Sequence, residues 1–139
     1  MKQYFAVIDT NVLVAAHLSQ LDDSAVVQVF NKIIHNEIVP LYSDKIIEEY
    51  KEVLSRKKFS FDPSIINYTL ALIINRGIKV DPKPSGIELI DIKDLVFYEV
   101  VLEKKDDGAY LITGNKKHFP IDPIVVTANE FLDIIKSNK

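Results

Sequence analysis

The sequence contains no cysteine and no long hydrophobic segment. The absence of cysteine excludes disulfides, thiolate zinc sites and cysteine nucleophiles, and it suits the reducing cytoplasm, where we expect the protein to reside. No stretch approaches the ~20 apolar residues that a membrane helix needs, and the apolar run near the N-terminus is too short for a secretory signal. We therefore expect a soluble protein without a membrane partner.

The sequence also lacks an excess of basic residues, because its formal net charge at pH 7 is −3. This charge argues against a protein that binds nucleic acid through overall basicity, although a nuclease with a carboxylate-rich metal site can be acidic and keep a local basic rim. The length of 139 residues and the hydrophobic fraction of 47% are typical of one globular domain. We predict a single domain over residues 1–139.

Short apolar runs alternate with segments of helical periodicity. The runs expected to form strands are 4–8, 38–42, 78–80, 109–113 and 124–126, and Pro40 suggests an edge strand or a strand end in the second. The expected helices cover 24–36, 44–56, 62–77, about 91–104, and the residues after the capping box at 127–130. This alternation predicts an α/β fold: a three-layer α/β/α sandwich with a twisted, mainly parallel sheet of about five strands.

Two polar side chains follow expected strands. Asp9 comes directly after the first strand, and Asn115 comes shortly after the fourth. Ligands of open parallel sheets bind beyond the carboxyl ends of the strands, so both residues are candidates for a site. Each also has a structural explanation, Asp9 as the cap of a short helix and Asn115 as an ordinary turn residue.

Two adjacent glutamates of the second expected helix face different ways. The helical angle places Glu48 roughly 160° from the centre of the apolar stripe, together with Glu52, whereas Glu49 lies ~100° from it, at the border of the buried face. A carboxylate at that border is costly unless it is compensated. A salt bridge or a functional partner would provide the compensation.

The fourth expected helix is apolar on nearly every side, and its first turn carries Asp91 and Asp94. Capping and the helix dipole account for both acids, but Asp94 also lies at the buried head of the helix, where a metal ligand would be useful. Three acids and an amide, Asp9, Glu49, Asp94 and Asn115, are thus expected at elements that meet at one end of a sheet. This coincidence indicates a hard-cation site with oxygen ligands.

Over nearly its whole length the chain resembles the PIN-domain ribonucleases, especially the small single-domain toxins of toxin–antitoxin pairs. The resemblance rests on segments 7–13 (Val-Ile-Asp-Thr-Asn-Val-Leu), 43–59, 91–94 (Asp-Ile-Lys-Asp) and 111–116 (Leu-Ile-Thr-Gly-Asn-Lys). It implies a twisted parallel sheet, Asp9, Glu49 and Asp94 as the acidic metal-site residues, an antitoxin as partner and, by default, a homodimer. Asn115 departs from the family pattern, in which aspartate is common, and a neutral amide would hold a second metal less firmly.

The predicted function is therefore a metal-dependent endoribonuclease that hydrolyses RNA phosphodiester bonds with Mg²⁺ or Mn²⁺. Asp9 and Asp94 are expected to ligate the main ion, Glu49 to ligate it or orient water, and Asn115 to bind a second ion or substrate. Hydrogen bonds that fix the carboxylates are expected from Thr10, Asn11 and Thr113. A basic rim for RNA is expected from Arg56, Lys57, Lys58, Lys116 and Lys117, with His118 as a possible phosphate contact.

Two other functions compete with this prediction. A phosphatase with Asp9 as nucleophile would need a second acid at position 11, which is Asn11. A non-catalytic PIN-like module that binds nucleic acid or protein is favoured by the neutral Asn115. No glycine-rich phosphate loop follows the first strand, so a dinucleotide site is not expected.

Overall fold

The sheet of this protein is built from five parallel strands. The computed structural model describes residues 2–138, and within them the strands are β1 (Tyr4–Ile8), β2 (Ile38–Tyr42), β3 (Ile78–Lys79), β4 (Tyr110–Ile112) and β5 (Val125–Val126). They pair in the order β3-β2-β1-β4-β5, and each pairing is parallel. All five strands expected from the apolar runs are present, and β1 lies at the centre of the sheet.

Six helices accompany the strands: α1 (Thr10–Leu18), α2 (Ala25–Ile34), α3 (Asp44–Leu54), α4 (Pro63–Arg76), α5 (Leu95–Glu103) and α6 (Ala128–Ser137). Short 3-10 turns occur at η1 (Lys57–Phe59), η2 (Ile92–Asp94), η3 (Lys105–Asp107) and η4 (Lys116–His118). The five helices expected from periodicity are confirmed, whereas α1 appeared in the prediction only as the short helix that Asp9 might cap. Within residues 2–138 no helix is both long and apolar enough to span a bilayer.

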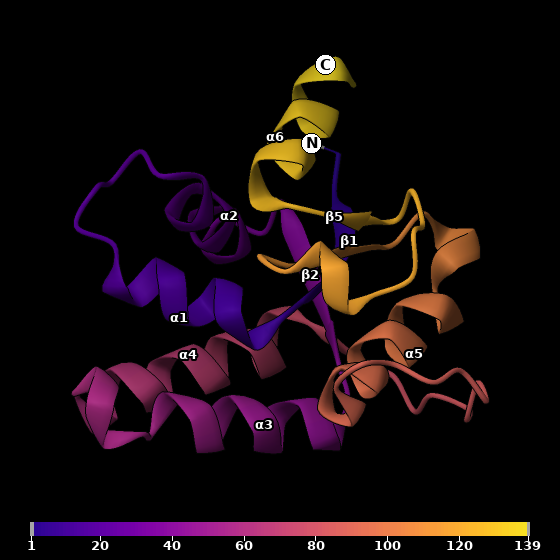
Figure 1. The fold of residues 1–139 in the computed structure, drawn as a ribbon. Coiled ribbons are helices and arrows are strands. Elements are labelled where there is room, and N and C mark those ends of the chain that lie inside the picture. Colours follow the sequence, from indigo (N-terminus) through magenta and orange to yellow (C-terminus); the bar gives the residue numbers. More distant parts are fainter. Residues whose placement is uncertain (1, 139) are drawn as a thin grey trace.

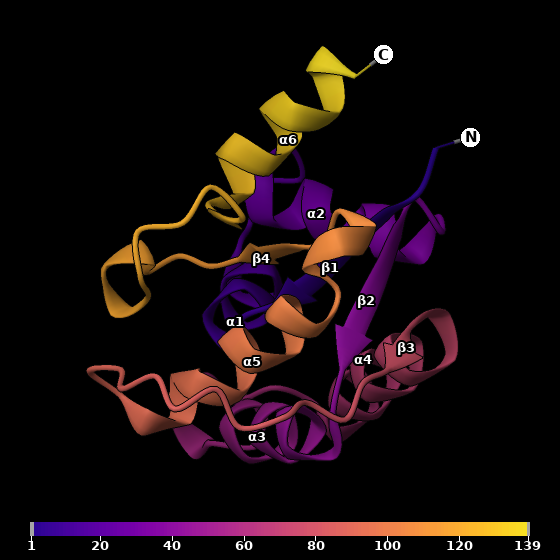
Figure 2. The same cartoon turned by 90° about the vertical axis from the view of Figure 1, so that its right-hand side faces the viewer.

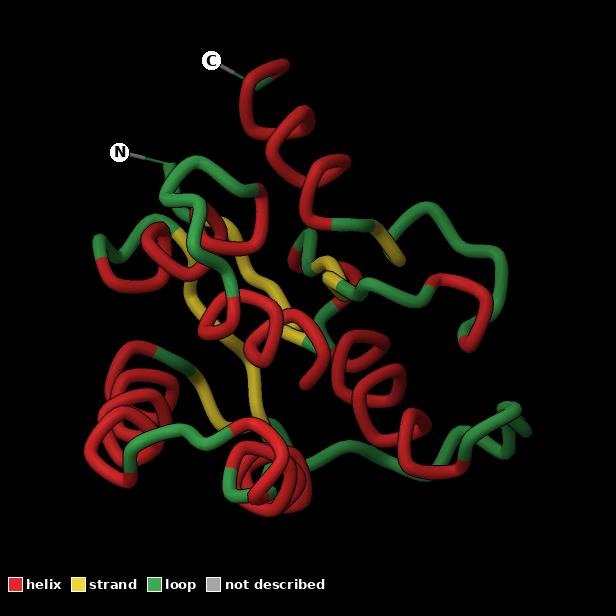
Figure 3. The backbone as a smooth tube through the Cα atoms, turned by 60° about the vertical axis from the view of Figure 1, so that its left-hand side comes forward, coloured by secondary structure: helices red, strands yellow, loops and turns green. Residues whose placement is uncertain are grey.

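The helices cover the two faces of the sheet, which gives the predicted α/β/α layers (Figures 1 and 3). On one face α5 packs against β1, β2 and β4, and on the other lie α1 and α2, with α6 against α2. Helices α3 and α4 lie side by side at the lower end of the sheet, where α4 contacts β2 (Figure 1). Figure 2 shows the long segment between β3 and α5 passing along this lower end of the molecule.

The central strands place two polar residues beside each other. Ile8 of β1 pairs with Ile112 of β4, and both are fully buried. The next residue on each strand is polar, Asp9 after β1 and Thr113 after β4, and the Asp9 N–H donates a hydrogen bond of 2.9 Å to the Ile112 carbonyl. Because parallel strands end at the same edge, the loops after β1 and β4 meet there.

The expectation that Pro40 marks an edge or strand end is wrong, because β2 lies between β1 and β3, and Pro40 is its middle residue. Proline is tolerated there because β3 pairs only with Leu41 and Tyr42, beyond the proline. Gly77 lies against Pro40 instead, and a β-carbon at Gly77 would be 2.3 Å from the Pro40 carbonyl oxygen. Gly77 therefore ends α4 and, because it has no side chain, also lets α4 approach β2 closely.

Candidate active site

A cleft of about 440 Å³ opens beyond the carboxyl ends of β1 and β4. The four predicted oxygen donors all line it: Asp9, Glu49, Asp94 and Asn115. They come from four separate segments: the end of β1, helix α3, the η2 turn and the loop after β4. Two larger hollows, beside β5 and between α3 and the start of α5, do not include Asp9. The chemistry of the lining, not the size, therefore identifies this cleft as the candidate site.

Asp9 is the most buried acid of the cleft, with 5% of its surface exposed. Its Oδ2 accepts a hydrogen bond of 2.7 Å from the Thr113 hydroxyl and a longer one, 3.4 Å, from the Asn11 amide. Asp9 occupies the N-cap position of α1, but its side chain makes no capping hydrogen bond. Asp9 therefore precedes a short helix, as the capping explanation expects, but its carboxyl group does not cap that helix and lines the cleft.

The surroundings of Asp9 make its negative charge unfavourable. Burial raises the pKa of Asp9 from 3.8 to about 6, against the opposing effect of the Thr113 hydrogen bond. The negative charges of Asp94 and Glu49 raise this pKa further. Since one pKa unit corresponds to ~1.4 kcal/mol, a cation beside Asp9 would relieve a substantial electrostatic cost.

Glu49 differs from its neighbour on α3 as the helical angles predict. Glu48 and Glu52 are exposed, whereas Glu49 is half-buried and lines the cleft. The Thr10 hydroxyl donates a hydrogen bond of 3.4 Å to Glu49 Oε2, which links the start of α1 to α3.

Tyr50, the residue after Glu49, was not recognised in the sequence as part of the site. It is fully buried, and its hydroxyl donates a hydrogen bond to the Ile8 carbonyl at the end of β1. Burial, with the nearby charges of Asp9 and Glu49, raises the pKa of Tyr50 well above its usual value, so its hydroxyl stays protonated. Tyr50 thus connects α3 to the strand end that carries Asp9.

The two acids of η2 have different contacts. Asp91 caps the turn, because its side chain accepts a hydrogen bond of 3.0 Å from the Lys93 N–H. Asp94 makes no capping bond; its Oδ2 lies 3.0 Å from Nδ1 of His118. Burial raises the pKa of Asp94, and the hydrogen bond from His118 opposes that rise.

The loop after β4 is tied to the loop after β1. The Gly114 N–H donates to Oδ1 of Asn11, and the Asn115 N–H donates to the Thr113 hydroxyl, each at 3.0 Å. The Asn115 side chain contacts the ring of His118. His118 therefore contacts both Asn115 and Asp94 at the edge of the cleft, and its phosphate contact stays a prediction.

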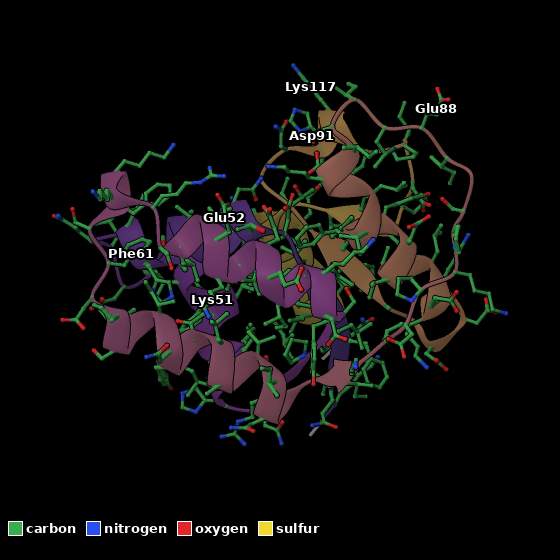
Figure 4. All side chains as sticks on the ribbon, turned by 90° about the horizontal axis from the view of Figure 1, so that it is seen from below. Lys51, Glu52, Phe61, Glu88, Asp91 and Lys117 are labelled. Atoms are coloured by element: carbon green, nitrogen blue, oxygen red, sulfur yellow. The ribbon has the colours of Figure 1, made fainter. Side chains whose placement is uncertain are left out.

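The predicted basic rim is only partly at the cleft. Arg56 lines the cleft and pairs with Glu52 at 2.9 Å. Lys57 and Lys58 lie on η1 and do not line it, whereas Lys116 and Lys117 line the hollow beside β5, where Lys116 pairs with Glu130 at 3.1 Å. Lys93 lines the cleft and was not predicted. Figure 4, viewed from below, shows Glu52 on α3 and labels Asp91 and Lys117 on other segments of the chain.

The donors fit Mg²⁺ or Mn²⁺ in kind, since these hard cations prefer carboxylate and amide oxygens. Within residues 2–138, however, no three His, Asp or Glu side chains are grouped closely enough to hold one ion. The carboxylate of Asp94 is hydrogen-bonded to His118, and the carboxylate of Glu49 is hydrogen-bonded to Thr10. The predicted acids thus share a cleft, but the described side-chain positions do not form a complete set of ligands around one ion.

Comparisons with known proteins identify the family and the fold of the chain. A family model of the PIN domain matches residues 6–117, whereas no curated protein matches the chain. The fold is similar to that of PAE2754 from Pyrobaculum aerophilum, with a TM-score of 0.57 and 13% identity over 97% of this chain and 90% of that one. It is also similar to VapBC2 from Rickettsia felis bound to a DNA fragment from their promoter, with a TM-score of 0.53 and 16% identity over 88% of this chain and 96% of that one. Because the family match spans most of the sequence and both structures share the fold, the chain belongs to the PIN-domain family.

Proposed function

We propose that this PIN-domain protein is an endoribonuclease that depends on Mg²⁺ or Mn²⁺. The observation that carries the proposal is the convergence of four oxygen donors, Asp9, Glu49, Asp94 and Asn115, from four segments on one cleft. The raised pKa of Asp9 supports it, because this buried carboxylate gains stability from a neighbouring cation.

Each side chain has a proposed task. Asp9 and Asp94 would hold the main ion, Glu49 would ligate it or orient the attacking water, and Asn115 would bind a second ion or the substrate. When bound, the cation supplies a Lewis acid and lowers the pKa of a water molecule. Hydrogen bonds from Thr113 and Asn11 restrict the Asp9 carboxylate, and the Thr10 hydroxyl restricts Glu49.

The RNA substrate would contact the basic side chains at the rim. Arg56 and Lys93 line the cleft and are placed to neutralise backbone phosphates. Lys57, Lys116 and Lys117 remain candidates to contact a more distant part of the same RNA molecule.

The proposed biological role is that of the toxin in a toxin–antitoxin pair. Its support is the family match and the fold shared with the VapBC2 structure. Co-expression with the product of a small neighbouring gene, followed by size-exclusion chromatography, tests for an antitoxin that binds the chain. Light scattering on the protein alone tests the predicted homodimer.

The activity is tested with labelled RNA and an equivalent DNA, each incubated with Mg²⁺, Mn²⁺ or EDTA. Glu49→Gln is the informative variant and Glu48→Gln the matched control, because the two glutamates are adjacent but only Glu49 lines the cleft. We expect metal-dependent cleavage of RNA, a loss of about 10²-fold or more for Glu49→Gln, and little change for Glu48→Gln. Cleavage in EDTA, or equal cleavage by wild type and Glu49→Gln, contradicts the proposal.

A non-catalytic module that binds nucleic acid or protein is the second candidate. Two observations favour it: Asn115 brings no charge to the cleft, and no three acidic or histidine side chains of residues 2–138 form a ready ion site. Such a module would bind the labelled RNA without cutting it and with the same affinity in EDTA.

A further inference from the structure

Three side chains form a cluster that the sequence did not predict. Nδ1 of His118 lies 3.0 Å from Oδ2 of Asp94, and the Asn115 side-chain nitrogen lies 2.9 Å from Nε2 and 3.3 Å from Nδ1 of the same ring. The Asp94 side chain is 15% exposed and that of His118 is 37% exposed. The cluster therefore joins the loop after β4 to the η2 turn at the edge of the cleft.

The chemistry of the Asp94 contact gives it a direction. An ionised carboxylate has only lone pairs to offer, so Nδ1 of His118 donates to Oδ2 of Asp94. The Asn115 amide nitrogen lies close to both ring nitrogens, so it packs against the ring without pairing with one of them.

The contact with Asp94 defines a task for His118. Because Nδ1 donates to Asp94, this nitrogen is not available to accept a proton from water or to contact a phosphate. The effect of Nδ1 on the site therefore passes through Asp94.

We propose that His118 is a positioning residue for Asp94. The hydrogen bond from Nδ1 holds Oδ2 of Asp94 and leaves Oδ1 for the cation of the proposed function, on which this inference rests. Partners that orient a ligating side chain in this way commonly contribute 10–100-fold to metal affinity or activity, as an order of magnitude.

Manganese binding measured by isothermal titration calorimetry tests the positioning role on the full chain. His118→Ala removes the donor, whereas His118→Asn places an amide N–H near the position of Nδ1. We expect His118→Ala to bind Mn²⁺ about 10–100-fold more weakly than wild type and His118→Asn to recover most of that loss. His35→Ala is the matched control, because His35 is exposed and does not line the cleft. Thermal denaturation verifies that each variant is folded.

The hydrogen bond from His118 to Asp94 is tested separately by nitrogen-15 NMR of the imidazole rings at mildly alkaline pH, without metal. We expect His118 to show a protonated Nδ1. An unprotonated Nδ1 in wild type, or His118→Ala that binds Mn²⁺ as tightly as wild type, overturns this inference alone. His118→Asn as weak as His118→Ala also overturns it. Failure of wild type to bind Mn²⁺ overturns the proposed function as well.

Discussion

Thr113 donates a hydrogen bond of 2.7 Å to the Asp9 carboxylate across 104 positions of sequence. The parallel pairing of β1 with β4 brings the two residues together at adjacent strand ends. The same hydroxyl accepts a hydrogen bond from the Asn115 N–H, so it connects the buried acid to the loop after β4. Loss of this hydroxyl should therefore affect both stability and the cleft.

Thr113→Val removes the hydroxyl while keeping the side-chain shape. We expect a loss of about 1–3 kcal/mol in the free energy of unfolding, because buried polar partners lose their hydrogen bond. We also expect Mn²⁺ affinity to fall by about 10-fold or more, because the Asp9 carboxylate is no longer fixed. Urea denaturation and calorimetric titration measure the two effects.

Thr69→Val is the control for that substitution. Thr69 is as buried as Thr113, and its hydroxyl donates to the Ile65 carbonyl at 2.9 Å, but it does not line the cleft. It should lose stability without losing Mn²⁺ affinity. A similar loss of affinity in both variants would show that the effect is general destabilisation.

Asp9→Asn should stabilise the metal-free protein near neutral pH. Burial raises the pKa of Asp9 from its ordinary value of 3.8 to about 6 in the folded protein. The contribution of Asp9 to stability is therefore present below pH 3.8 and is lost as the pH rises through 6. The ionised carboxylate then costs up to about 3 kcal/mol, which the neutral amide avoids. Urea denaturation in EDTA should show the gain at neutral pH and almost none near pH 4. A gain that does not change with pH would contradict the assigned pKa shift.

Gly77→Ala tests the packing of α4 on β2. The added β-carbon would lie 2.3 Å from the Pro40 carbonyl oxygen and 2.5 Å from that of Ile73. Both contacts are with backbone atoms, so the backbone must shift, and we expect a cost of about 1–3 kcal/mol. Gly108→Ala is a useful contrast, since its β-carbon meets no atom within 4 Å and only its positive φ opposes the change. Equal unfolding midpoints for Gly77→Ala and wild type would contradict the packing described.

The sequence predicts the strands and most helices because their apolar residues follow a clear period. Helix α1 is the exception: its buried residues Thr10, Val12, Leu13 and Val14 follow one another without a polar stripe, so periodicity does not reveal it. The interior position of Pro40 depends on where β3 begins to pair, which no local pattern encodes.

The candidate site was predictable where it depends on strand ends and helix faces. Asp9 follows an apolar run, and Glu49 lies at the border of a helical stripe, so both were found from the residues. The contact of His118 with Asp94 depends on the path of the loop after β4, which has no periodicity. The place of Lys93 in the cleft depends on the η2 turn for the same reason.

The central claim is that Asp9, Glu49 and Asp94 share one cation. An anomalous difference map from crystals of the protein soaked in Mn²⁺ tests it most directly. We expect a manganese peak in the cleft, in contact with carboxylate oxygens of at least two of the three acids, and no such peak in crystals of Asp9→Asn. A map without a peak in the cleft, or a peak held only by other residues, would contradict it.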